Sequence, residues 1–184
     1  MSATLVLWLS ATSCAGTSVD TQIAPTTVLA VAEERVLSAT QLLETMKWPT
    51  DLRPMPLSPR AKNQLQGFIF DDREIAAAVS DVVAVGVTRN SDPLGALLLV
   101  GVTDNVIGNM SFIDGLRAAM LANAETTNTE TARWGLLVGS VAVVGTEVWA
   151  ILPVGSVVAF AVATSRQDLD QLLEAVSDQV TRGQ

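Results

Sequence analysis

The chain has 184 residues, of which 49% are hydrophobic, and its 19 acidic and 11 basic side chains give a net charge of −8. It contains one cysteine and neither histidine nor tyrosine, which excludes an intramolecular disulfide, a Ser-His-Asp triad and zinc sites built from histidine or several cysteines. The acidic balance disfavours binding to nucleic acid or to anionic lipid, because both require a basic surface.

The N-terminal segment combines a short apolar run with the single cysteine. Residues 3–9 read ATLVLWL, and Ser10-Ala11-Thr12-Ser13-Cys14 follows. The segment resembles the signal peptide of bacterial lipoproteins, in which small residues precede a cysteine that is lipidated and becomes the first mature residue. The resemblance implies a signal peptide over residues 1–13, acyl chains such as palmitate on Cys14, and anchoring to the extracytoplasmic face of the cell membrane.

Two other fates of this segment are compatible with the sequence. Small residues at Ser13-Cys14-Ala15 and at Ala30-Val31-Ala32 have the spacing that signal peptidases accept, so cleavage there would release a secreted protein. Alternatively, Leu5 to Leu9 forms a first strand of a cytosolic structural subunit, and Cys14 is a small buried side chain. The apolar run is too short for a spanning helix, which needs about 20 residues.

The residues after Cys14 predict a tether followed by a single domain. Residues 14–27 are small and polar, as in a flexible tether, and residues 28–184 suffice for one domain with its own core. Residues 27–32 (TVLAVA) predict a strand. Ser38-Ala39-Thr40-Gln41 predicts a capping box at the start of a helix that Trp48-Pro49 ends.

The middle of the chain alternates turn residues with apolar runs. Residues 50–59 hold three prolines and predict a rigid extended loop, and residues 64–70 (QLQGFIF) predict a strand. The charged residues 71–74 predict a turn and a helix that continues through Val79. Residues 82–88 and 94–103 predict two strands joined by a hairpin loop.

The last third of the chain predicts helices on both sides of a meander. Residues 110–124 have a helical apolar face, and residues 124–132 form a polar linker. Three strands follow, at residues 133–144, 146–152 and 156–164, broken at glycines. A C-terminal helix over residues 166–181 has an apolar face of Leu169, Leu172, Leu173, Val176 and Val180.

These elements predict the α+β class: an antiparallel sheet with helices packed on one face, ending in a three-stranded meander and a C-terminal helix. A membrane hairpin over residues 135–164 is disfavoured, because the uncharged stretch of residues 148–164 is too short for two spanning helices. Buried strands explain this composition, since a sheet covered on both faces contains near-continuous apolar runs.

Carboxylates are the remaining source of acid–base chemistry. Asp71, Asp72 and Glu74 are close in sequence, but no calcium-loop pattern surrounds them, and a solvated helix N-terminus explains them better. Ser58 and Lys62 lack the S-x-x-K spacing, and the adjacent prolines disfavour a helix there, so we do not expect a catalytic pair.

Trp134 and Trp149 lie on successive predicted strands and, with Phe160 and Leu116, are the candidates for an apolar ligand pocket between sheet and helices. Packing in the core is the more ordinary role of such side chains.

We therefore expect a membrane-anchored extracytoplasmic lipoprotein with a non-catalytic binding or structural domain, working without cofactor or metal. Its expected partners are the membrane, through Cys14, and another protein of the cell envelope. Two alternatives are a carrier of a lipid or small apolar ligand and a carboxylate-dependent enzyme centred on residues 71–74.

Overall fold

The computed structural model describes residues 38–71, 73–103, 110–121 and 129–183. The chain divides into two units, residues 1–34 and residues 35–184, and the described residues belong to the second. The predicted signal peptide, Cys14, the tether and the strand at residues 27–32 therefore lie outside the described residues.

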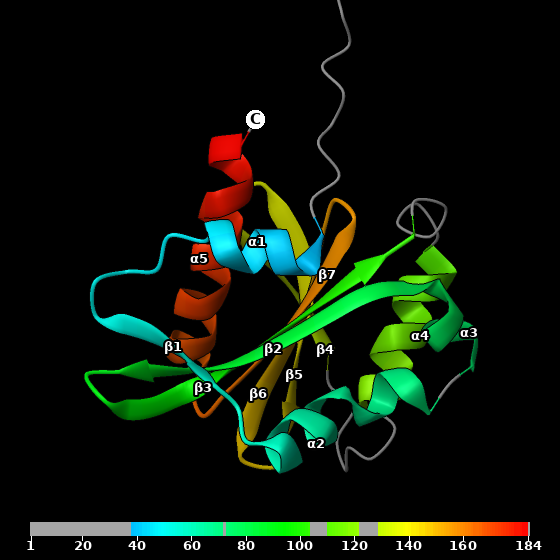
Figure 1. Ribbon diagram of the computed structural model, residues 1–184, viewed down its shortest axis with the longest axis horizontal. Helices are drawn as coiled ribbons and strands as arrows, with labels where there is room; N and C mark the ends of the chain where they lie inside the picture. The colour runs from blue at the N-terminus through cyan, green and yellow to red at the C-terminus, as the bar shows by residue number, and fades with distance from the viewer. Residues whose placement is uncertain (1–37, 72, 104–109, 122–128, 184) are drawn as a thin grey trace, which may run out of the picture. The chain divides into compact units, whose positions relative to one another are not determined.

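Seven antiparallel strands form one sheet in the order β1-β2-β3-β7-β6-β5-β4 (Figure 1). The described elements confirm the α+β class and the antiparallel sheet. β3 pairs with β7, which places the seventh described strand beside the third and leaves β1 and β4 as the two edges of the sheet that the described residues form. The strands are β1 (Leu52–Pro56), β2 (Val79–Arg89), β3 (Asp92–Val102), β4 (Thr129–Trp134), β5 (Leu137–Val144), β6 (Glu147–Val154) and β7 (Val157–Ala163).

Four two-residue loops form the hairpins of this sheet. Asn90 and Ser91 join β2 to β3 with positive φ angles of 50° and 81°, as a type I′ turn requires. Gly135, Gly145 and Gly155 open the other three loops with φ angles of 59°, 62° and 54°, which fits type II′ turns that begin with glycine. The first of these turns divides the predicted strand 133–144 into β4 and β5.

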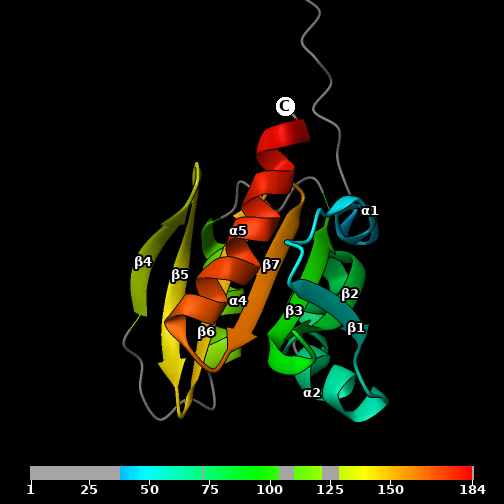
Figure 2. The same cartoon turned by 90° about the vertical axis from the view of Figure 1, so that its left-hand side faces the viewer.

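Helices cover both faces of the sheet (Figure 2). α1 (Ala39–Thr45) and α5 (Arg166–Gly183) pack on one face, here called the α5 face, while α2 (Pro59–Phe70), α3 (Arg73–Ala78) and α4 (Met110–Leu121) pack on the opposite α4 face. Along β3, Leu97 and Leu99 join the core that contains Leu172 of α5, whereas Leu98 joins the core that contains Leu116 of α4. The prediction of helices on a single face is therefore wrong in this detail.

The N-terminal helix confirms its predicted capping box. The Ser38 hydroxyl accepts a hydrogen bond from the Gln41 backbone N–H at 3.1 Å, and the Gln41 side chain accepts one from the Ser38 N–H at 3.1 Å. The helix ends before Trp48 and Pro49, as predicted. The predicted loop at residues 50–59 contains the short edge strand β1.

The predicted strand at residues 64–70 is wrong, because these residues form the second half of α2. Ser58 caps this helix by accepting a hydrogen bond from the Ala61 N–H at 3.2 Å, and Pro59 occupies its first turn. A proline is favourable there because that position has no intrahelical N–H partner to lose. The prolines that were expected to prevent a helix therefore flank and begin one. None of the helices in the described part of the chain is long and apolar enough to cross a membrane.

Asp81 on β2 joins α1 to the sheet. Its carboxylate accepts hydrogen bonds from the backbone N–H groups of Ala39 and Thr40, at 3.2 and 3.0 Å, and from the Thr40 hydroxyl at 3.1 Å. Gly101 lies opposite Asp81 on β3, and a Cβ built on Gly101 would come within 1.9 Å of the Asp81 Oδ1. The absence of a side chain at residue 101 therefore leaves Asp81 room to hold the first turn of α1.

We expect Asp81→Ala to lower the free energy of unfolding of the full chain by about 1 kcal/mol, the usual effect of losing a helix cap. Gly101→Ala should destabilise the wild type more than it destabilises the Asp81→Ala variant, because the added methyl displaces a carboxylate that the variant lacks. Equilibrium denaturation of the four proteins in this cycle measures the coupling. If the changes in the free energy of unfolding are additive, the absence of a side chain at Gly101 is not required for the contacts of Asp81.

Candidate functional site

The four candidate pocket residues lie on opposite sides of the sheet. Trp134 is 3% exposed and belongs to the core of the α5 face. Leu116, Phe160 and Trp149 belong to or pack against the core of the α4 face. The structure therefore brings three of the candidates together as packing residues and separates them from Trp134 by the sheet itself, so the four do not line a common pocket.

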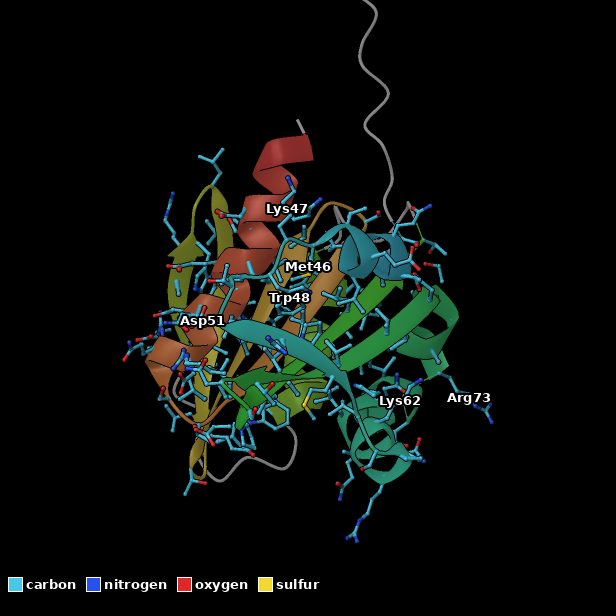
Figure 3. All side chains as sticks on the ribbon, turned by 60° about the vertical axis from the view of Figure 1, so that its left-hand side comes forward. Met46, Lys47, Trp48, Asp51, Lys62 and Arg73 are labelled. Atoms are coloured by element: carbon cyan, nitrogen blue, oxygen red, sulfur yellow. The ribbon has the colours of Figure 1, made fainter. Side chains whose placement is uncertain are left out.

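Two of the three candidate carboxylates and the serine–lysine pair lie on the surface of the α4-face helices. Asp71 is exposed at the end of α2, and Glu74 is exposed in the first turn of α3, while Asp72 lies outside the described residues. Ser58 caps α2, and Lys62 is exposed one turn later. Arg73 extends outward beside this layer (Figure 3). Across the described ranges, no group of three histidine, cysteine, aspartate or glutamate side chains is placed to hold a metal ion.

A polar cluster fastens one side of α5 to β4. Asp170 Oδ1 accepts hydrogen bonds from Trp134 Nε1 and from Arg166 Nε, each at 2.9 Å. Arg166 also pairs with Glu130, and its guanidinium carbon lies 5.8 Å from the centre of the Trp134 ring. Burial lowers the pKa of Arg166, but the hydrogen bonds with Asp170 and Glu130 outweigh this effect and raise it above the usual value.

A second polar cluster fastens the other side of α5 to the opposite half of the sheet. Arg89, at the end of β2, lies 3.1 Å from Asp168 and 3.5 Å from Asp51, and it also donates to the Gln171 side chain. Ser165 caps the helix by accepting from the Asp168 N–H at 3.2 Å. Sequence reasoning located the start of this helix but missed both clusters. Their sequence signals were the Ser165-x-x-Asp168 capping pattern and the i, i+4 pair of Arg166 and Asp170.

Two open depressions flank α5. One, of about 270 Å³, is lined by Val141, Val143 and Val148 together with Glu130 and Arg166. The other, of about 280 Å³, is lined by Lys47, Asp51 and neighbouring residues of α5. Figure 3 shows Lys47 and Asp51 on the segment that runs beside this helix. Neither depression contains a predicted pocket residue.

The two edges of the sheet differ in their capacity to accept another strand. β1 carries Pro54 and Pro56, which lack the N–H groups that a further strand requires. β4 contains no proline, and Thr129, Glu130, Thr131 and Arg133 are exposed along it. This edge is therefore chemically able to extend the sheet, whereas the β1 edge is protected.

The turn between β4 and β5 determines which backbone groups of β4 point outward. Trp134 and Leu137 flank a two-residue loop, and such flanking residues form a hydrogen-bonded pair. Antiparallel pairs alternate between hydrogen-bonded and non-hydrogen-bonded, so Thr129, Thr131 and Arg133 direct their N–H and C=O groups away from β5. Exposed apolar side chains adjoin this edge, since Leu136 is 79% and Val138 43% exposed.

Comparison with protein-family models, curated proteins and solved structures found no match.

We expect Asp170→Ala to lower the free energy of unfolding by about 1–2 kcal/mol, because the Trp134 N–H and the Arg166 guanidinium both lose a charged acceptor. Glu174→Ala, at an exposed position on the same helix, serves as the matched control and should change stability by less than about 0.5 kcal/mol. Urea denaturation of the full chain measures both. Equal effects of the two substitutions would show that the cluster does not anchor α5.

Proposed function

We propose that this chain is a bacterial lipoprotein, anchored through acyl chains on Cys14 to the extracytoplasmic face of the cell membrane, and that its domain binds another protein without catalysing a reaction. The single observation that carries the binding role is the β4 edge, which lacks the prolines of the opposite edge and directs the backbone groups of Thr129, Thr131 and Arg133 outward. Pairing of an added strand with a free sheet edge is a recurrent mode of protein recognition.

The polar clusters beside α5 have a structural role, which leaves the β4 edge as the observation that supports binding. The charged groups of Arg166 and Arg89 are each engaged by carboxylates of the same chain, and these contacts hold α5 in place. On the outer side of β4, by contrast, no other described strand pairs with the backbone groups of Thr129, Thr131 and Arg133. The side chains of Leu136 and Val138 add apolar surface next to that edge, as expected of a protein contact.

The anchor is tested by the intact mass of the chain after expression in a bacterium that processes lipoproteins. We expect the wild type to lose residues 1–13 and to gain the mass of acyl chains, and Cys14→Ser to show neither change. An unmodified full-length wild-type chain in such a host would overturn the anchor.

The binding edge is tested by placing a photo-reactive amino acid at Thr131 in the anchored chain and illuminating intact cells. We expect covalent adducts with protein from Thr131, because its backbone and side chain lie on the open edge. The matched control places the same group at Met55, which is exposed on β1 between the two prolines and should give far fewer adducts. Equal adduct yields from the two edges would contradict a binding role for β4.

A further inference from the structure

We propose that the strand which pairs with β4 is the β4 strand of a second copy of this chain, related to the first by a twofold axis that passes through Thr131 perpendicular to the sheet. This inference rests on the proposed use of the β4 edge for protein binding and specifies the partner. The axis follows from the faces, charges and backbone groups of β4, taken in turn.

The faces of the sheet limit how two β4 strands can align. A twofold axis perpendicular to the sheet keeps both α5 faces on the same side, so directly opposed residues must belong to the same face. On β4 the α5 face carries Glu130, Ala132 and Trp134, and the α4 face carries Thr129, Thr131 and Arg133. The axis must therefore pass through a residue rather than between two residues.

Repulsion between like charges then disfavours two of the possible positions of the axis. An axis at Glu130 would oppose two carboxylates, and an axis at Arg133 would oppose two guanidinium groups, and like charges directly opposed across a strand pair are unfavourable. Axes nearer either end of the strand pair fewer residues. The alignments centred on Thr131 and on Ala132 remain.

The number of backbone hydrogen bonds distinguishes these two alignments. With the axis at Thr131, each outward-directed residue meets an outward-directed partner: Thr131 opposes itself, and Thr129 opposes Arg133 of the other copy. With the axis at Ala132, Thr129 would face Gly135 in the turn and its backbone groups would lose their partners. The Thr131 axis therefore forms more hydrogen bonds, and it places two threonines in a favourable cross-strand pair.

The same axis suits a pair of anchored chains. Because both α5 faces lie on one side of the joined sheet, both α1 helices, which follow the N-terminal segment, also lie on that side. Two chains anchored in one membrane are confined to a thin layer, which raises their local concentration above that in free solution, so an edge contact of modest area is enough.

Cross-linking of single-cysteine variants tests the axis. In the full chain, Cys14→Ser removes the only cysteine, so any cysteine then introduced is the sole reactive thiol. In this background Thr131→Cys places two thiols on residues whose Cα atoms are about 5.5 Å apart. Thr129→Cys is the matched control, because its two copies lie more than about 13 Å apart along the strands.

With a bis-maleimide shorter than that separation, we expect Thr131→Cys to yield covalent dimer and Thr129→Cys alone to yield little. A mixture of Thr129→Cys and Arg133→Cys chains should yield dimer again, because those residues oppose one another. Equal yields from Thr131→Cys and Thr129→Cys would overturn the proposed axis.

Ultracentrifugation of the Cys14→Ser chain supplies an independent measurement. Thr131→Lys should raise the dimer dissociation constant at least about tenfold by opposing two ammonium groups at the axis. Met55→Lys, on the protected edge, should leave the dissociation constant unchanged. A chain that stays monomeric at about 1 mM would overturn the inference. If the adducts formed at Thr131 in cells contain a different protein and never a second copy of this chain, the inference would be overturned. The proposed binding function would then still stand.

Discussion

The pairing of β7 with β3 is the constraint on which the rest of the structure depends. Residues Gly95 to Gly101 align with Val157 to Ala163, which joins the N-terminal strands and the C-terminal meander into one sheet. The two strands occupy the centre of that sheet, and both of their faces are buried. α5 can therefore cross one face while α4 covers the other, and β1 and β4 become the edges.

Much of the fold was predictable where a local signal determines the local structure. The capping box at Ser38, the hairpin loop between residues 88 and 94 and the apolar face of α5 have strong signatures within a few residues. The structure confirms the capping box, the hairpin and the burial of Leu169, Leu172, Leu173 and Val176. The wrong strand at residues 64–70 shows the limit of such reasoning. This seven-residue stretch, which has four apolar side chains and two glutamines, fits either a strand or the end of a helix. Ser58 and Pro59, which begin the helix, lie outside it.

The covering of the sheet and the placement of the tryptophans depend on non-local geometry. The uncharged composition of residues 148–164 indicated strands buried on both faces, as the structure has them. The order of the elements along the chain suggested helices on one face only, so composition was the better guide to the layers. The turn at Gly135-Leu136 escaped prediction because Leu136 is apolar although it is exposed. That missed turn made Trp134 and Trp149 seem to lie on neighbouring strands, whereas β5 separates them and their side chains emerge on opposite faces.

Pro54 and Pro56 on β1 have a consequence for how large any assembly can become. A sheet with two open edges can add molecules head to tail without limit, and such growth produces fibres. Among the described strands of this chain, the prolines protect the β1 edge, and β4 is the edge that remains suited to pairing with a further strand. Under the proposed pairing, one neighbour occupies the β4 edge, and the two prolines on β1 disfavour the addition of further strands that would extend the sheet into a fibre.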